Sequence, residues 1–440
     1  MSAVLDFPVK PEARDFLARF ARDSREPGWL AARRQQAMTR FAETGFPTRK
    51  NESWRYLDLQ PLESRPLLPA RLTARPDRAA LEAELVHFVQ PGSAARLVLV
   101  DGRFVPELSS IACPAGVWFA PMAEAIVERP ELVEAGIAAG TGDAAHPFAA
   151  LNAAFFADGF VLDVAPGLVL EQPIEIIHFA SGTSEASFHT RGLVSLGEGS
   201  SAGLVETYAG EGRYWRNDVV TVRLAAGAAL TRTVLIEEAP DAVHLGHLDA
   251  TLAAKARFVG FVLLLGGRRV RHEANVCLAG EGAGCEINGG FLVHGSDEAN
   301  IVTAIDHAAP GGRTNELIKG VAAGRGHGAF QGSITVREHA QKTDAHQLSR
   351  NLIIGRRAVI DTKPELEIHA DDVKCSHGAS VGDLDEAALF YLRARGIPPE
   401  EARRILIDGF LREAIESVDD LATRTHLLRR LAGRLGELEE

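Results

Sequence analysis

The feature that most constrains how this chain can fold is a series of short, β-branched segments separated by glycine-rich turns, which begins near Gly159. Segments such as GFVLDVAPGLVL, PIEIIHF and ARFVGFVLLL follow one another along much of the remaining sequence. Strands this short and this regularly spaced are typical of a β-sandwich, a barrel or a solenoid.

A repeat within these segments favours the solenoid. A small residue followed two places later by an apolar residue recurs at Ala202, Ala228, Ala256 and Ala283, and more loosely at Ala358 and Ala379. The first steps are 26, 28 and 27 residues (202 to 228, 228 to 256, 256 to 283). One structural unit per period, with glycine at the corners, is what a stacked β-solenoid requires. The pattern therefore predicts a mainly β fold with a solenoid core over residues 159–382.

Helical periodicity flanks this core on both sides. Residues 1–158 are predicted to form a mainly helical region with a proline-bounded connector, and the stretch 11–45 ends at a stop signal, Gly45. The segment RLVLVDGRF is a strand candidate inside that region. Residues 383–440 predict three further helices, the first beginning after an aspartate cap.

The C-terminal helices carry apolar residues at helical spacing, among them Leu389, Leu392, Leu406 and Phe410. Three helices have few internal partners, so we expect part of this face to bind another protein. The alternative is that the helices cap the end of the solenoid. The residues alone leave the two readings open.

Composition excludes several classes of protein. A formal charge of −12 argues against a nucleic-acid surface, which needs a basic patch. The longest apolar run, FVGFVLLLGG, is half of the about 20 residues that a membrane-spanning helix needs. The start, MSAVLDFPVKPEARD, lacks the pattern of a secretory signal, and four cysteines are too few for a disulfide framework. We therefore expect a cytoplasmic protein with reduced thiols and neither a nucleic-acid nor a membrane partner.

Four short sequence motifs that mark enzymes or nucleotide-binding proteins are incomplete, out of context or missing in this chain. The stretch GSSAG at 199–203 matches a nucleophile elbow, but strand rather than helix follows it, so a solenoid corner is the better interpretation. The stretch GRGHGA at 324–329 resembles a dinucleotide-binding loop, and again no helix follows. No P-loop sequence occurs, which excludes ATP hydrolysis by that motif. The pair His272-Glu273 lacks the second histidine of a zincin.

The cysteines differ in their surroundings. Cys285 falls on the apolar position of the repeat, and Cys277 is predicted to be a second inward-facing strand residue. Cys113 lies in a proline-flanked turn without neighbouring ligands. All three are interpreted as structural thiols.

Cys375 is different, because it lies two residues before His377 in VKCSHGASVG. Alternate residues of a strand share a face, so the two side chains are expected side by side, about 6.5 Å apart. A thiolate and an imidazole suit iron, zinc or iron–sulfur chemistry, and Lys374 would favour the thiolate if it lay close. Two ligands do not close a site, so the others would come from a distant strand or a second chain. A Cys–His nucleophile and a structural thiol stay as alternatives.

The residues around this pair resemble a known family. The stretch from QKTDAHQLSRNLIIG to PPEEARRILIDGF, residues 341–410, resembles the core signature of the SufB/SufD family of iron–sulfur cluster assembly proteins. The connector PTRKNESWRYLDL resembles a stretch near the start of SufD chains. An N-terminal cysteine cluster is missing, and Cys375-Ser-His377 stands where SufB chains tend to have Glu-His-Glu, so the resemblance is closer to SufD.

This resemblance implies a right-handed parallel β-helix between two helical domains. It also implies a SufB-like partner bound through the β-helix and a SufC-like ABC-type ATPase bound through the C-terminal helices. Cys375 and His377 would then contribute to a nascent iron–sulfur cluster shared with the partner, and the chain itself would not be an enzyme. Flavin binding to the complex and a homodimer of the lone chain are left open.

Rival functions remain at this stage. One is a stand-alone β-helix enzyme acting on acidic carbohydrates, and another is a mononuclear metal-binding solenoid without partners. A third is a purely structural subunit in which Cys375 is incidental.

Overall fold

The computed structural model describes residues 9–20, 26–70, 78–139 and 146–436. The predicted helical stretches of both terminal regions extend past these ranges, and residues 1–8, 21–25, 71–77, 140–145 and 437–440 lie outside the described residues. In the described part of the chain, no helix combines the length and the apolar character that a membrane crossing needs.

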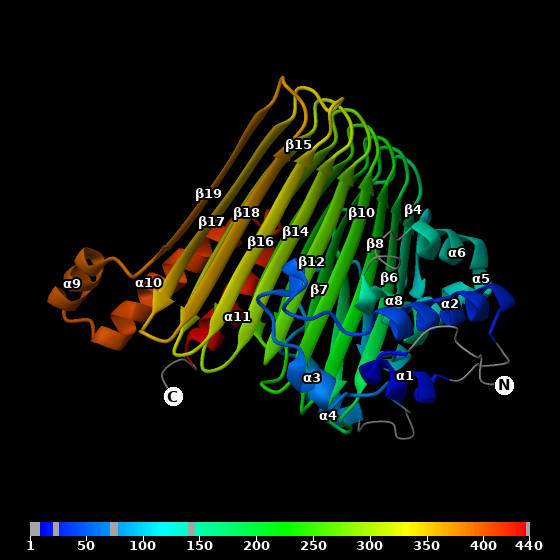
Figure 1. Cartoon of the computed structure of the whole chain (residues 1–440), viewed down its shortest axis with the longest axis horizontal. Coiled ribbons are helices and arrows are strands. Elements are labelled where there is room, and N and C mark those ends of the chain that lie inside the picture. Colours follow the sequence, from blue (N-terminus) through cyan, green and yellow to red (C-terminus); the bar gives the residue numbers. More distant parts are fainter. Residues whose placement is uncertain (1–8, 21–25, 71–77, 140–145, 437–440) are drawn as a thin grey trace.

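Two long sheets face each other and form a β-solenoid of about eight turns, which confirms the predicted solenoid fold (Figure 1). The ten-stranded sheet contains β1 (Ala95–Val100), β2 (Arg103–Phe104), β5 (Ile174–Ser181), β7 (Ser201–Glu211), β9 (Ala229–Glu237), β11 (Arg257–Gly266), β13 (Gly284–Val293), β15 (Arg313–Ala323), β17 (Asp344–Ile354) and β19 (Lys374–Gly382). The nine-stranded sheet contains β3 (Val117–Pro121), β4 (Asp158–Val164), β6 (Ser187–Leu196), β8 (Trp215–Leu224), β10 (Val243–Leu252), β12 (Arg269–Leu278), β14 (Glu298–His307), β16 (His327–Val336) and β18 (Val359–Ile368). The chain alternates between the sheets, so each turn of the solenoid adds one parallel strand to each sheet.

Strand register explains the repeat and corrects part of it. Ala228, Ala256 and Ala283 each precede the first residue of a strand, and those strands pair in register. The equivalent residue of the preceding turn is Ser200, because Ser201 pairs with Ala229, so the step from Ala202 was out of register. Ala358 and Ala379 are also misassigned: the first precedes a strand of the other sheet and the second lies inside β19. The true repeat continues through the paired residues Gly284, Arg313, Asp344 and Lys374.

Two inward-facing rows of the ten-stranded sheet lead to the candidate site. We call them the Cys375 row and the His377 row, after their last members. The Cys375 row contains Ala202, Leu230, Phe258, Cys285, Thr314, Ala345 and Cys375. The His377 row contains Leu204, Arg232, Gly260, Ile287, Glu316, Gln347 and His377. Cys285 is buried in the main core, as predicted.

Cys277 does not face the core. Its neighbours on β12, Val276 and Leu278, are buried in the main core, and strand alternation therefore turns Cys277 outward. Its Sγ lies 3.9 Å from Oδ2 of Asp306 on the next strand. The inward prediction for Cys277 was wrong, because both faces of this sheet are covered in places and the period-two pattern is blurred.

The N-terminal helices lie mostly on the outer face of the nine-stranded sheet, except that the helix carrying Leu81 and Leu85 packs on β1, β5 and β7 of the ten-stranded sheet. They are α1 (Arg14–Arg19), α2 (Gly28–Thr44), α3 (Gln60–Ser64), α4 (Arg78–Leu85), α5 (Met122–Glu128), α6 (Pro130–Ala139) and α8 (Pro147–Phe155), with 3₁₀ turns at Pro11–Ala13, Glu52–Trp54 and Pro106–Leu108. Phe41 of α2 and Phe148 of α8 belong to one aromatic cluster with Trp215 of β8. Gly45 ends α2 with a φ of 65°, so the predicted stop is confirmed. The strand candidate in this region is also confirmed, since β1 pairs with β5 inside the β-helix.

The C-terminal helices are α9 (Glu386–Ala394), α10 (Pro399–Ile415) and α11 (Leu421–Gly436). Asp385 caps α9 by accepting hydrogen bonds from the backbone of Ala387 and Ala388, as predicted. Helices α10 and α11 pack on the outer face of the ten-stranded sheet, where Leu411 and Ile415 join one core cluster with sheet residues. They do not cap the open end of the solenoid, and α9 projects away from the sheets (Figure 1).

The predicted corner at 199–203 is confirmed. Gly199 has a φ of 65° and β7 begins at Ser201, so the serine of GSSAG enters a strand. A left-handed turn residue is available to glycine at little cost, which explains its place there.

Candidate functional site

Cys375 and His377 lie on β19, the last strand of the ten-stranded sheet. Cys375 pairs with Ala345 and His377 with Gln347, so both side chains continue inward-facing rows of the β-helix. Within the described residues, β19 pairs only with β17, and no further strand continues the sheet. The pair therefore lies at the open end of the solenoid, where a further turn of the β-helix would pack against β18 and β19.

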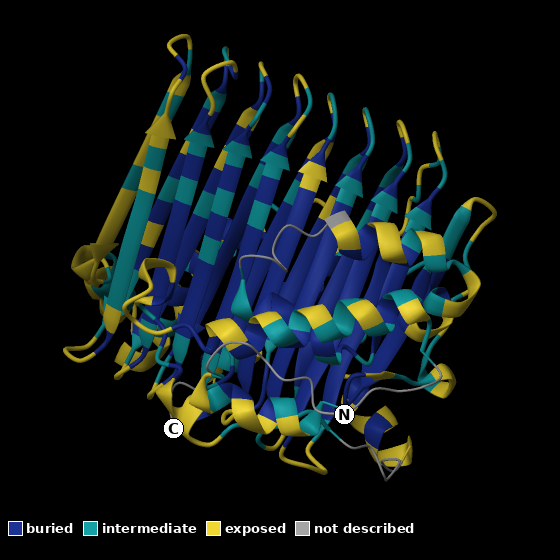
Figure 2. Cartoon of the chain, turned by 45° about the vertical axis from the view of Figure 1, so that its right-hand side comes forward, coloured by how far each residue is buried: buried dark blue, intermediate teal, exposed yellow. Residues whose placement is uncertain are grey.

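Exposure distinguishes this end from the rest of the β-helix. Cys375 is half-buried and packs against the main core, whereas His377 is exposed. Figure 2 shows the same change for whole strands: the central strands are buried, and the last strands are largely exposed or intermediate. The structure thus brings the two predicted side chains together on one face, partly reachable from solvent.

The Cys375 thiol is not activated in the isolated chain. Burial raises the pKa of the Cys375 thiol, the Asp344 carboxylate adds to the rise, and a backbone hydrogen bond with Ala345 opposes it. Strand alternation turns Lys374 to the other side, so the expected help from its charge is not realised. The thiol therefore favours its protonated form until a metal ion or another chain's charge displaces the proton.

Beneath His377, the same row holds two buried polar residues that the sequence analysis missed. Gln347 donates a hydrogen bond from Nε2 to Oε2 of Glu316 at 2.6 Å, and both side chains are almost fully buried. Burial raises the pKa of Glu316 to about 7, although hydrogen bonds with Gln347 and Thr303 oppose the rise. The sequence signal was the alternation of Thr314 and Glu316 on a strand whose inward face was otherwise expected to be apolar.

The four apolar residues proposed for partner binding are all half-buried. Leu389 and Leu392 lie on α9, and Leu406 and Phe410 lie on α10. Phe410 faces the sheet: Nζ of Lys319 lies 4.3 Å from its ring centre, and its carbonyl accepts a hydrogen bond from the same Nζ. The most exposed apolar side chains of this region are instead Phe390, Tyr391 and Ile405, with Leu421 at the start of α11.

The C-terminal helices are firmly attached to the β-helix. Lys319 of β15 also pairs with Glu413 of α10. Arg430 of α11 holds Glu237 of β9 through two hydrogen bonds of 2.7 and 2.6 Å. Lys319 and Glu316 lie on the same strand and on opposite faces, so α10 contacts the outside of the strand whose inside carries Glu316.

Comparisons with known proteins give a consistent result. The family model for the SufBD core domain of SUF system iron–sulfur cluster assembly matches residues 178–410, and the model for the SufBD N-terminal region matches residues 20–176. The chain is 31% identical to the iron-sulfur cluster assembly protein SufD of Escherichia coli (strain K12), over 91% of this chain and 92% of that protein. It is 30% identical to the chloroplastic protein ABCI7 of Arabidopsis thaliana, over 91% and 85% respectively. The SufD protein of Bacillus subtilis (strain 168) is 25% identical, over 92% and 94%.

Proposed function

Because the chain belongs to the SufBD family of iron–sulfur cluster assembly proteins, we propose that it is the SufD-like subunit of an ATP-driven assembly scaffold. In this proposal the open end of its β-helix pairs with a SufB-like chain. Cys375 and His377 then contribute to a nascent cluster site shared by the two chains. The cluster is cargo that gathers there before transfer to an acceptor, and this chain is a non-catalytic subunit.

The observation that carries the proposal is the place of Cys375 and His377 on a terminal strand, which pairs with β17 on one side and has a free edge on the other among the described residues. An exposed strand edge offers unpaired backbone groups, which a second chain satisfies by continuing the sheet. Within the described residues, β18 and β19 both lack a neighbour on their outer side. Cys375 and His377 are the last members of the two inward rows. A partner strand placed at this edge would therefore cover the thiol and the imidazole.

The donor set also supports a shared site. Thiolate and imidazole are suitable ligands for iron and for iron–sulfur clusters, but a closed site needs about four ligands. Cys375 and His377 supply two of them. A second chain that supplies further ligands would complete the site, and it would also remove the exposed thiol from solvent.

The C-terminal helices are the proposed contact for a SufC-like ATPase. Their exposed apolar residues, Phe390, Tyr391 and Ile405, lie next to the predicted Leu389, Leu392 and Leu406. Lys319 and Glu413 connect α10 to β15, and β15 carries Glu316 two places along its row from His377. Closure of the ATPase subunits would pull on α10, and this connection is a route by which the pull reaches the site.

Copurification tests the assembly. The tagged chain is purified anaerobically from its own host and its composition is measured by native mass spectrometry. We expect one SufB-like chain and a P-loop ATPase bound to it. A lone chain or a homodimer without an ATPase would contradict the assembly and return attention to the stand-alone carbohydrate enzyme and the mononuclear metal protein.

A double variant tests the site. Cys375→Ser, His377→Ala is expected to keep the complex intact and to lower cluster formation severely, measured by iron and acid-labile sulfide bound to the complex. The matched control is Cys277→Ser, His339→Ala, which removes a half-buried thiol and an exposed imidazole away from β19. Full cluster assembly by the Cys375, His377 variant would refute the site and leave a purely structural subunit.

A further inference from the structure

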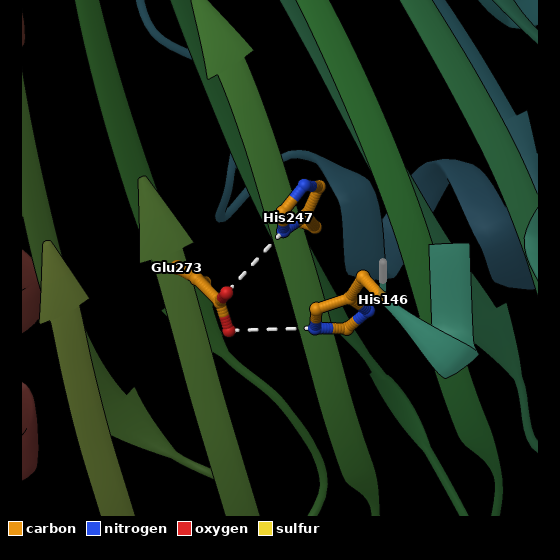
Figure 3. A group of neighbouring side chains, drawn as sticks. All are labelled: His146, His247 and Glu273. Atoms are coloured by element: carbon orange, nitrogen blue, oxygen red, sulfur yellow. Dashed lines mark ion pairs between the residues drawn. The ribbon is translucent and has the colours of Figure 1, made fainter. Parts of the chain in front are cut away.

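A second group of side chains that could bind a metal ion lies on the other sheet, at positions far from Cys375 in the sequence. His247 is on β10, Glu273 is on the adjacent β12, and the two residues pair directly in register. His146 comes from the N-terminal region, where it caps α8. Figure 3 shows the three side chains pointing toward one another over the outer face of the nine-stranded sheet. Among the described residues, they are the group whose ligand atoms all lie within 4.8 Å of one another.

The distances within this group are unusual for hydrogen bonds. His146 Nε2 lies 3.4 Å from Oε2 of Glu273, and His247 Nδ1 lies 3.7 Å from its Oε1. Charge-assisted hydrogen bonds are shorter, about 2.7–2.9 Å. Two ligands of a tetrahedral ion with bonds of about 2.1 Å are separated by roughly 3.4 Å. The two distances are measured to different oxygens of the Glu273 carboxylate, but one ligand atom from each of the three side chains lies within 4.8 Å of the others, which is close enough for one ion to contact all three.

The surroundings hold these ligands in place. His247 Nε2 lies 3.1 Å from Oδ2 of Asp249, which leaves Nδ1 directed at Glu273. Arg271 pairs with Oε2 of Glu273 at 2.7 Å, and its guanidinium lies over the Trp54 ring. Carboxylates that orient a ligating imidazole and partners that fix a ligating carboxylate are general features of metal sites. The side chains are also shielded, with exposed fractions of 3% for His247 and 12% for His146 and Glu273.

The geometry points to a metal site: we propose that His146, His247 and Glu273 bind one divalent transition-metal ion. Two imidazoles and one carboxylate suit Zn²⁺ and Fe²⁺, and a water molecule would complete four ligands. The site lies on a different sheet from Cys375 and uses no thiol. It is therefore independent of the cluster site and of the proposed function.

Binding at this site has identifiable costs. His146 Nδ1 accepts the backbone hydrogen bond of Ala149 that caps α8, and metal binding at Nε2 would move the ring proton to Nδ1 and break that bond. Burial disfavours the charged form of His247, but the nearby carboxylates of Asp249 and Glu273 outweigh burial and raise the pKa of His247 to about 9, so the ion also displaces a proton. The net charge remains moderate, because Asp249 and Glu273 offset Arg271 and part of the ion's charge.

An ion bound here would connect two parts of the chain. His146 belongs to the helical region that covers the nine-stranded sheet, whereas His247 and Glu273 belong to the sheet itself. One ion would therefore fasten residues separated by about a hundred positions, which stabilises the folded state by mass action. The expected role is to hold the helical cover on the β-helix.

The experiment uses the full chain carrying Cys375→Ser and His377→Ala, so that the cluster site cannot bind the added ion. Metal-stripped protein is equilibrated anaerobically with Zn²⁺ or Fe²⁺, and bound metal per chain is measured by mass spectrometry. We expect one ion per chain and a rise in Tm that a chelator reverses. Comparison of the two dissociation constants identifies the preferred ion.

Three variants and one control assign the ligands. His247→Gln, Glu273→Gln and His146→Asn are each expected to weaken binding by about 100-fold or more. Asparagine retains a good cap for α8, so His146→Asn removes the ligand without removing the cap. The control is His189→Gln, a buried histidine on β6 under the same helical cover, which is expected to bind metal normally.

Two results would overturn the proposal. One is the failure of the chain to retain Zn²⁺ or Fe²⁺ after equilibration. The other is equal retention by the Cys375→Ser, His377→Ala chain and by the same chain with His146→Asn added, once both are shown to be folded. Substitution with Co²⁺ adds an independent readout, because a thiolate charge-transfer band would show that a cysteine binds the ion instead.

Discussion

Two parts of the β-helix treat buried polar groups in opposite ways: the strands β7 to β9 under the N-terminal helices, and the last strands, β15 to β19. Under the N-terminal helices, the interior contains complete ion pairs: Arg216 with Glu238 at 2.7 Å and Arg232 with Glu206 at 2.6 Å, all buried. Toward the open end, Glu316 is equally buried, and no ion pair with a cationic side chain is found for it among the described residues. We call the part around β7 to β9 the closed end, because helices cover it and strands continue on both sides, and the part from β15 to β19 the open end.

The comparison separates polar groups that maintain the fold from those that serve a site. At the closed end, burial would raise the pKa of Glu238, but Arg216 and His244 outweigh burial and lower it to about 2. At the open end, burial prevails and raises the pKa of Glu316 to about 7, so a large share of this carboxyl group stays protonated up to near-neutral pH. Paired charges fix one arrangement, whereas an unpaired carboxyl group can exchange a proton when its surroundings change.

The largest expected effect comes from breaking a closed-end pair. Arg216→Ala leaves Glu238 charged and buried without its main partner, which costs about 3–5 kcal/mol. The free energy of unfolding, measured by urea denaturation, is expected to fall by this amount. Arg213→Ala is the control, since Arg213 pairs with Glu185 at the surface and such a pair contributes about 0–1 kcal/mol. Equal losses in the two variants would mean that the buried pair has no special role.

The second prediction concerns pH at the open end. The folded-state pKa of Glu316 is raised from 4.5 to about 7, so its stabilising contribution is complete below pH 4.5 and is lost as the pH rises to 7. Wild-type stability should therefore fall relative to Glu316→Gln by about 2 kcal/mol between pH 5.5 and 7.5. Urea denaturation of both proteins at the two pH values measures the difference. A constant difference would show that Glu316 ionises normally.

The smallest expected effect on stability is at His377. Its side chain is exposed at the end of its row, so His377→Ala should change the free energy of unfolding by less than about 0.5 kcal/mol. Cluster formation by the complex should nevertheless fall, because one proposed ligand is lost. His339→Ala removes another exposed imidazole and is expected to leave both readouts unchanged. A large loss of stability in His377→Ala would place this residue with the structural groups of the closed end.

The sequence predicted the repeat well where its signal is local. Glycine turns mark the corners, and a small residue precedes the strands β7, β9, β11 and β13, so the solenoid and the corner at Gly199 could be inferred from spacing. The strand-to-strand register could not be obtained in the same way, and the first step was assigned to Ala202 instead of Ser200. A small residue inside a strand and one in a turn look alike in sequence, although only the turn residue has a fixed place in the stack.

Side-chain direction was harder to predict. On β19 the alternation was clear, and Cys375 and His377 share a face as expected. On β12, residues of both faces are buried, so the outward position of Cys277 could not be distinguished from an inward one. The group at His146, His247 and Glu273 was missed because it joins three distant segments, and only the packing of the helical region on the sheet brings them together.

The parallel stack of the β-helix has a further consequence. Among the residues that the structure describes, a central strand such as β10 has neighbours on both sides, whereas β18 pairs only with β16 and β19 only with β17. In a nearly one-dimensional stack, each unit is stabilised mainly by its neighbours, so the terminal unit opens at the lowest free energy. Amide hydrogen exchange should therefore become faster along the molecule toward residue 382. A chain bound at that edge would supply the missing neighbour and would stabilise the last turn. Binding of such a chain and ordering of the last turn would then be thermodynamically coupled. A subunit without its partner would then present its least protected backbone to cellular proteases.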